Sequence, residues 1–295
     1  MLLRKPKSLN HRDTEPQKKL LNAKTAKVNR LRAGLKAALM PLLLACIGIA
    51  QAQQKVLRTA EEVRRLSPEE AGQHIPVHLK GVVTFSDELL FSRFVQDETA
   101  GIYLREITNT APPNAGDQVE VEGLTDAGEY APIVVPMNVR ILSQEPLPPA
   151  KQVSLEQLVS GQEDSQFVQV SGTVRSVRFE EESQNYLIDL VTGGERFTAY
   201  SRQLPVTNIE SLVESVLKVR GVCSTLFNRQ RQLFGFRLLV PRATDLEIEK
   251  PALANPFSVA TQPISSLLQF TAQSTTGHRV KVAGTVVYQE PGVAL

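Results

Sequence analysis

Tryptophan is absent from this chain of 295 residues, and cysteine and histidine are scarce, with two and four copies. Cys46 falls in an apolar segment near the N-terminus and Cys223 in an expected strand, so no cysteine pair remains for a disulfide in the rest of the chain. The histidines lack the nearby set of cysteines and histidines that a zinc site needs. They are His11, His74, His78 and His278. We therefore expect no metal and no cofactor, and a stability that comes from packed β cores.

Signals of catalysis are missing as well. The serines include no glycine-flanked elbow, and no histidine is placed to activate one of them. Adjacent acids at Asp97 and Glu98 could hold a cation or provide a general acid, but a hard cation needs about six or more oxygen ligands. We interpret Asp97 as a residue that bonds its own backbone in a turn, and Gly101 as one that adopts a positive φ. The sequence thus predicts a protein that is not an enzyme.

The charge is distributed unevenly, although the formal net charge is only +2. Residues 1–36 carry eleven lysines and arginines against two acids, and the part after Ala52 carries 22 basic and 29 acidic residues. Proteins that bind polyanions gain affinity by neutralising phosphates with lysine and arginine. An acidic folded part therefore argues against nucleic acid as a partner.

The basic segment precedes the longest apolar run of the chain. Ala37–Ala50 holds fourteen uncharged residues and is followed by the small-x-small sequence Ala50-Gln51-Ala52, the order of a secretory signal. A run this short falls below the roughly 20 residues that a helix needs to cross a bilayer. Residues 1–52 are therefore expected to be a basic region plus a signal peptide or membrane anchor, and the rest to be exported, either periplasmic or membrane-anchored facing the periplasm.

A short phrase of alternating valines that ends in a glycine occurs three times. Its copies are Val77–Val83, Val168–Val174 and Val280–Val286. A repeat of this size predicts several copies of one small β-module. The third copy has only begun at Leu295, so we expect the front part of a longer protein.

Each of the first two copies carries the strands of a small closed barrel. In copy 1 the expected strands are 76–84, 93–97, 101–105, 118–123 and 134–142. In copy 2 they are 167–177, 186–190, 196–200, 217–223 and 232–240. Short helical or turn-like leaders precede the first strands at 59–71, 154–161 and 264–276, and proline-rich linkers occupy 144–151 and 251–263. The expected modules are 56–148 (module 1), 152–250 (module 2) and 263–295 (the truncated start of module 3).

Two segments of copy 1 carry a resemblance to a known fold. Phe94–Leu104 (FVQDETAGIYL) and Gly116–Gly123 (GDQVEVEG) are similar to the hairpin and a later strand of bacterial OB-fold modules. With the signal and the proline linkers, the chain resembles the tandem OB-fold extracytoplasmic region of bacterial membrane sensor histidine kinases. This resemblance implies all-β, five-stranded barrels with short helices and a role in sensing. Neither a phospho-accepting histidine motif nor an ATP-binding glycine box is present, so the kinase part itself is absent. Copy 2 departs from the hairpin pattern at Asp189–Gly194.

Candidate binding residues follow from the face that OB barrels present to extended ligands, strands 2 and 3 with the adjoining loops. Alternation places Ile102 and Leu104 in the core and Tyr103 and Arg105 outward, with Arg93 beside them. Copy 2 interleaves aromatic residues with arginines near 196–202 and 227–237, a pattern that is also explained by core phenylalanines and solvated arginines at strand edges. The candidate ligand-binding residues are Arg93, Tyr103, Arg105, Arg196, Tyr200, Arg229 and Arg231.

Three functions are consistent with these patterns. The first is a non-catalytic, ligand-sensing or binding region of a membrane signal-transduction protein, attached to the membrane through its N-terminal segment. The second is a structural or protein-interaction spacer built of OB modules. The third is a protein that binds single-stranded nucleic acid or oligosaccharide. A small molecule, an oligosaccharide or a protein is therefore the expected partner.

Overall fold

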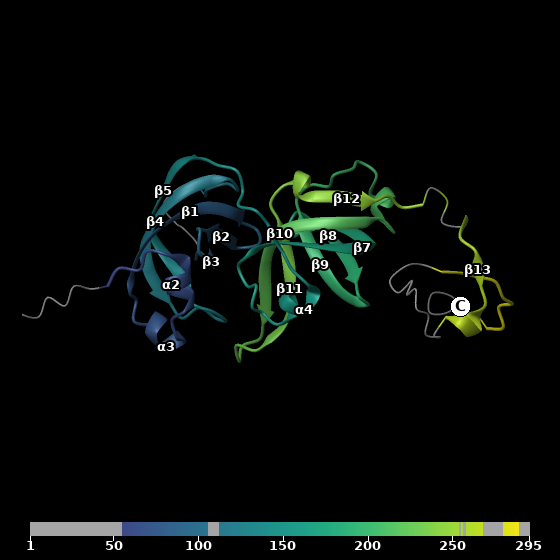
Figure 1. Ribbon diagram of the computed structural model, residues 1–295, viewed down its shortest axis with the longest axis horizontal. Coiled ribbons are helices and arrows are strands. Elements are labelled where there is room, and N and C mark those ends of the chain that lie inside the picture. Colours follow the sequence, from purple (N-terminus) through teal and green to yellow (C-terminus); the bar gives the residue numbers. More distant parts are fainter. Residues whose placement is uncertain (1–54, 106–111, 254, 256–257, 268–279, 289–295) are drawn as a thin grey trace, which may run out of the picture. The chain divides into compact units, whose positions relative to one another are not determined.

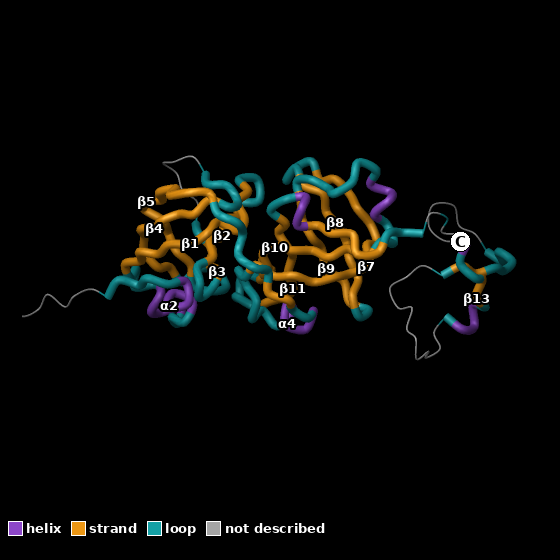
Figure 2. The backbone as a smooth tube through the Cα atoms, turned by 45° about the horizontal axis from the view of Figure 1, so that its top comes forward, coloured by secondary structure: helices purple, strands orange, loops and turns teal. Residues whose placement is uncertain are grey.

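The computed structural model describes residues 55–105, 112–253, 255, 258–267 and 280–288. The expected signal or anchor at residues 1–52 lies outside this part of the chain. Within it, no helix combines the length and the apolar character that a membrane span requires. The described residues fold mainly into strands with few short helices (Figures 1 and 2), which confirms the all-β prediction.

Module 1 contains a five-stranded sheet that closes on itself. Its strands are β1 (Pro76–Asp87), β2 (Ser92–Gln96), β3 (Gly101–Tyr103), β4 (Asp117–Asp126) and β5 (Ile133–Gln144). The order is β3-β2-β1-β4-β5 with antiparallel neighbours. A parallel bridge between Leu104 and Val134 joins the two ends of the sheet. This closed five-stranded arrangement is the OB-fold.

Module 2 repeats the same strand order. Its barrel strands are β7 (Phe167–Glu180), β8 (Asn185–Thr192), β9 (Glu195–Ser201), β10 (Val216–Phe227) and β11 (Leu233–Val240), and the sheet is extended by β6 (Lys151–Gln152) and β12 (Leu246–Lys250). Parallel pairing of β11 with β9 and antiparallel pairing of β10 with β7 close the barrel. The sequence did not predict β12, which pairs with β10 beside the barrel. Single 3₁₀ turns occur at η1 (Ile209–Leu212) and η2 (Ala243–Asp245).

The predicted leaders are short helices, α2 (Ala60–Arg64), α3 (Pro68–Ala71) and α4 (Leu155–Val159). Each begins with a capping box, as where Thr59 accepts the N–H of Glu62 while the Glu62 carboxylate accepts the N–H of Thr59. Helices this short have little stability alone, so the reciprocal caps and one buried face define them. Val63 and Leu158 provide that face and pack into the cores of their modules.

The repeated glycines occupy equivalent places in the two barrels. A Cβ on Gly81 would lie 2.7 Å from the carbonyl oxygen of Gln96 on β2, and one on Gly221 would lie 2.8 Å from that of Leu239 on β11. Gly172 faces β8 in the same way that Gly81 faces β2. Close approach of a neighbouring backbone excludes a side chain at Gly81 and Gly221, whereas Gly172 meets the Cβ of Leu190 at 3.1 Å.

The third copy reproduces only the first pairing of a module. In every copy, residues that precede the leader pair in parallel with the first strand: Leu57 with Val77, β6 with β7, and β13 (Thr261–Gln262) with β14 (Lys281–Val282). The short turn η4 (Ile264–Ser266) stands where a leader is expected. The strand expected at 280–287 is regular only over β14. A third module therefore stays a prediction.

The modules have separate cores and share a small apolar junction. Phe85 and Phe94 of module 1 pack with Phe167, Val222 and Leu239 of module 2. Because Phe94 lies on β2, the outer surface of the first barrel's β1–β2 hairpin is covered by β7, β10 and β11. Module 2 thus lies against the face on which OB folds bind ligands.

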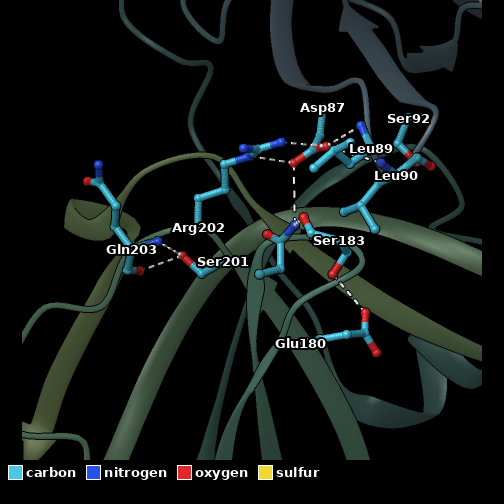
Figure 3. A network of polar contacts seen from close by, with 10 residues as sticks. Asp87, Leu89, Leu90, Ser92, Glu180, Ser183, Ser201, Arg202 and Gln203 are labelled. Carbon is cyan, nitrogen blue, oxygen red and sulfur yellow. Dashed lines mark hydrogen bonds and ion pairs between the residues drawn. The ribbon is translucent and has the colours of Figure 1, made fainter.

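A polar contact reinforces the junction (Figure 3). Arg202 donates from Nε and Nη2 to the two carboxylate oxygens of Asp87, at 2.7 and 2.9 Å. The buried Asp87 side chain also accepts the N–H groups of Leu89 and Leu90 and the side-chain amide of Asn185. Burial raises the pKa of Asp87, but the hydrogen bonds and the charge of Arg202 outweigh it, so the pKa lies below its ordinary value.

Asp97 acts in a turn, as predicted, whereas Gly101 differs from the expectation. Asp97 Oδ1 accepts the N–H groups of Thr99 and Ala100, and Oδ2 accepts the N–H of Ala60 at the start of α2. The prediction of a positive φ at Gly101 is wrong. Gly101 is needed because the carbonyl of Ser165 in module 2 occupies the place of a Cβ.

Candidate ligand-binding cleft

The outer face of β2 and β3 is aromatic. Ile102 and Leu104 are buried in the core, as predicted, and Tyr103 between them is half-buried on the other face. The Tyr103 ring meets Phe94 edge-on with centroids 5.4 Å apart, and its hydroxyl donates to the carbonyl of Phe91 at 2.8 Å. This hydrogen bond ties the β1–β2 loop to β3.

Arg105 extends this face toward the β4–β5 loop, residues 127–132. Its Nη2 and Nη1 donate to the two oxygens of Asp126 at 2.9 and 3.3 Å. The N–H of Gly128 donates to the same carboxylate, and this bond, together with Arg105, holds the pKa of Asp126 below its ordinary value. The positive charge of Arg105 is therefore compensated, and the ion pair fixes the start of the loop.

The β10–β11 hairpin of module 2 holds the other end of that loop. Arg231 donates from Nη2 to the carbonyls of Ala127 and Tyr130, at 3.0 and 3.4 Å. The Tyr130 ring stacks on Phe227, with centroids 5.8 Å apart and planes 8° from parallel. Burial raises the pKa of Tyr130, and the charge of Asp164 adds to this shift.

These elements enclose a cleft of about 420 Å³ between the modules. Six aromatic residues line it: Phe91, Phe94, Tyr103, Tyr130, Phe227 and Phe234. Phe91 in module 1 and Phe234 in module 2 are 67% and 69% exposed, an unusual state for large apolar side chains at one site. The cleft lies over strands 2 and 3 and beside the β1–β2 and β4–β5 loops, which are the binding elements of OB folds.

The charges that line the cleft are balanced in sign. Arg105 and Arg237 stand against Glu129 and Asp164. Asp164 lies 3.6 Å from Arg64 and accepts the hydroxyl of Thr225, whereas Glu129 is exposed to solvent. The lining therefore lacks the excess of positive charge that a phosphate backbone requires.

Arg237 differs from Arg105 and Arg231, whose guanidinium groups donate to a carboxylate and to carbonyls. It is half-buried on β11, and its guanidinium carbon lies 5.1 Å from the centroid of the Tyr200 ring. Its Nε is buried and has no hydrogen-bond partner within the described part of the chain. A cation held over an aromatic face is stabilised by the ring but keeps its hydrogen-bonding edge.

The structure distributes the predicted site residues unevenly. Tyr103 and Arg105 line the cleft, Arg231 anchors the loop beside it, and Tyr200 lies beneath Arg237. The expectation that Arg93 lies on the outer face is wrong, because it is only 4% exposed. Its carbonyl accepts the N–H of Leu104, which places Arg93 beside a buried core residue. The two remaining residues, Arg196 and Arg229, are exposed and do not line the cleft.

Sequence reasoning missed the aromatic residues of the loops. Phe91 and Tyr130 stand in the two loops that flank the binding face, so an OB assignment together with loop aromatics is the signal that could have found them. Phe234 and Arg237 belong to the aromatic and arginine pattern of module 2, which was also explained by core packing. That explanation holds for Phe236, which is buried, and fails for Phe234.

Other side chains give no sign of chemistry at the cleft. The described residues contain no group of three or more histidine, cysteine, aspartate or glutamate residues that could hold a metal. Cys223 is buried, and burial raises the pKa of its thiol far above the ordinary value. It therefore packs as a small apolar residue in the core of module 2.

Comparisons with known proteins find weak structural similarity only. No protein-family model matches the chain, and no curated protein matches it. Among solved structures, a putative aspartyl-tRNA synthetase of Leishmania major has a TM-score of 0.29 and 12% identity, over 40% of this chain and 24% of that one. The aspartyl-tRNA synthetase of Entamoeba histolytica has a TM-score of 0.27 and 16% identity, over 40% and 28%. The chain thus spans only about a quarter of these synthetases.

A second set of structural matches covers a larger share of the matched protein. A murine DNA-binding protein bound to double-stranded DNA has a TM-score of 0.28 and 12% identity, over 60% of this chain and 99% of that one. At this level of similarity, the OB assignment rests on the strand order and closure of the two barrels.

Proposed function

We propose that the two modules form a non-catalytic binding unit that holds an oligosaccharide in the cleft. The observation that carries this proposal is the set of aromatic side chains from both modules around one cleft, two of them largely exposed. A pyranose ring has an apolar face of C–H groups that packs on aromatic rings, while its hydroxyls bond to polar groups at the rim. OB folds use this same face for oligosaccharides and oligonucleotides.

The balance of charge favours sugar over nucleic acid. A single strand of DNA or RNA needs a positively charged groove along its backbone as well as stacking platforms. Here Arg105 is paired with Asp126 and Asp164 with Arg64, so Arg237 and Glu129 leave the lining without an excess of positive charge. A ligand with few charges fits this cleft better than a polyphosphate.

Export across the membrane and a role in sensing are also part of the proposal. Export across the membrane rests on the basic and apolar segments of residues 1–52. A sensing role would require an output region connected to the modules. Ligand binding between two modules suits such a role, because it can alter how the modules contact each other.

A spacer is the second candidate, favoured by the junction. The apolar cluster around Phe94 and Phe167 and the ion pair of Asp87 with Arg202 fix one arrangement of the modules. A fixed arrangement is what a spacer needs. This function predicts that the exposed phenylalanines contribute nothing to ligand binding.

The test is calorimetric titration of the full chain with neutral hexasaccharides of glucose and of N-acetylglucosamine. Phe91→Ala and Phe234→Ala should each weaken binding by about 1–3 kcal/mol, the usual contribution of one stacking platform. Phe179→Ala is the matched control, because Phe179 is 47% exposed on β7 and does not line the cleft.

Two results would contradict the proposal. One is the absence of binding to any oligosaccharide. The other is tight, strongly salt-dependent binding of single-stranded DNA that both phenylalanine variants weaken, which would identify a nucleic-acid site instead.

A further inference from the structure

Arg237 lines the cleft from β11. On β11 it stands between Ser224 of β10 and Thr198 of β9 in the strand register. Both Arg237 and Ser224 line the cleft, and Tyr200 supports the guanidinium from below. The position is set by the barrel strands and not by a loop, so it is well fixed.

Its charge has no ionic partner within the described part of the chain, in contrast to its neighbours. Arg105 is paired with Asp126 and Arg202 with Asp87, while Arg231 donates to two carbonyls. The Arg237 guanidinium lies over the Tyr200 ring, and its buried Nε has no hydrogen-bond partner among the described residues. A half-buried guanidinium without an ionic partner can bind an anion, since its planar set of N–H donors matches the two oxygens of a carboxylate.

We infer that Arg237, with the hydroxyl of Ser224, forms a subsite for one carboxylate of the ligand. The cleft then selects oligosaccharides that carry hexuronic acid units over neutral ones of the same length. This inference rests on the proposed binding of oligosaccharide. Glu129 and Asp164 on the same lining limit the number of negative charges that the ligand can carry, so an isolated carboxylate fits and a chain of phosphates does not.

The test compares three ligands on the full chain by calorimetry: a glucose hexasaccharide that carries one glucuronate unit, the methyl ester of the same hexasaccharide and a neutral hexaglucan. The wild-type protein should bind the free acid about tenfold more tightly than the ester, as one charge-assisted contact predicts. Because the ester differs only at the carboxylate, this comparison needs no variant and does not depend on the folding of one.

Variants then locate the subsite. Arg237→Met should remove the preference for the free acid, so it should weaken binding of the acid about tenfold more than it weakens binding of the neutral hexaglucan. Arg229→Met is the matched control, an exposed arginine at the tip of the same hairpin, and should keep the preference. Arg237→Lys retains the charge without the fork, so it should keep part of the preference.

The outcomes separate the two proposals. Equal binding of acid and ester by the wild-type protein, or an equal effect of Arg237→Met on charged and neutral ligands, overturns the carboxylate subsite and leaves oligosaccharide binding intact. Failure of all three ligands to bind overturns both.

Discussion

The two barrels have equivalent strands, β-bulges and glycines. They differ at one equivalent pair of residues on the outer face of the second and third strands. After the bulge of the first strand, module 1 places Phe94 opposite Tyr103, and module 2 places Asp189 opposite Thr198. The first pair is aromatic and forms part of the cleft. In the second pair, Asp189 accepts hydrogen bonds from Thr198 and Ser176, at 2.9 and 2.7 Å, so both of its carboxylate oxygens have partners within module 2.

This difference separates what the scaffold requires from what a site requires. Closure of a small barrel needs glycines where backbones approach and apolar residues that alternate inward, and both modules have them. The outward pair is not constrained by closure, so it can be aromatic in one copy and polar in the other. We infer that a binding face exists on module 1 and that module 2 serves as its second wall.

The largest expected effect concerns the equivalent glycines Gly81 and Gly172. A Cβ at Gly81 would meet a backbone oxygen and the Val95 side chain at 2.7 Å, whereas at Gly172 the nearest atom is the Cβ of Leu190 at 3.1 Å. Gly81→Ala should therefore destabilise by about 3 kcal/mol, and Gly172→Ala by about 1 kcal/mol or less. Urea unfolding of the full chain followed by far-UV circular dichroism measures both. Equal losses would contradict this account and would show that the two positions are more alike than their Cβ distances indicate.

The ion pair between Asp87 and Arg202 at the junction is expected to contribute less to the free energy of unfolding than Gly81 does. Arg202→Met leaves the buried Asp87 carboxylate with only neutral hydrogen-bond donors. Because the Arg202 side chain is half-exposed, water can partly replace the guanidinium in the variant. The expected loss of stability is about 2 kcal/mol. Arg175→Met is a control for the loss of an arginine from an ion pair within module 2, because Arg175 bonds to Glu214 of the same module.

The same pair predicts a dependence on pH. The pKa of Asp87 is lowered in the folded protein, so its contribution is complete above the unfolded value of about 4 and is lost as pH falls through the folded value. The stability difference between the wild-type protein and Arg202→Met should therefore be constant near neutrality and shrink below about pH 4. A difference that grows on acidification would contradict this account.

Barrel strands were predictable from the sequence because their signals are local. Alternating valines, the glycine at the end of the phrase and the turn residues between strands define β1 to β5 and β7 to β11 within a few residues. The first leader was predicted from leucine and valine at helical spacing among charged residues. Tyr103 and Arg105 were found because the outward position of a residue follows from alternation once the core residues are known.

Features that depend on contacts between distant segments were not predictable. The cleft requires the β10–β11 hairpin to meet the β4–β5 loop, and no local pattern indicates that Phe234 and Phe91 share a site. The burial of Arg93 departs from alternation, because four successive residues of β2, from Ser92 to Val95, are buried. The parallel pairing of β6 and of β13 with the first strands of their modules joins segments that are separated by a whole leader.

The smallest expected effect is a difference between two arginines of the β10–β11 hairpin, Arg229 and Arg231. The sequence alone gives no reason to distinguish them. Arg231 bonds to the carbonyls of Ala127 and Tyr130, whereas Arg229 is exposed at the hairpin tip. Arg231→Ala should cost about 1 kcal/mol, speed amide hydrogen exchange in the β4–β5 loop and weaken hexasaccharide binding a few-fold. Arg229→Ala should change none of these. Unaltered exchange in the loop of Arg231→Ala would mean that stacking of Tyr130 on Phe227 holds the second wall of the cleft without the arginine.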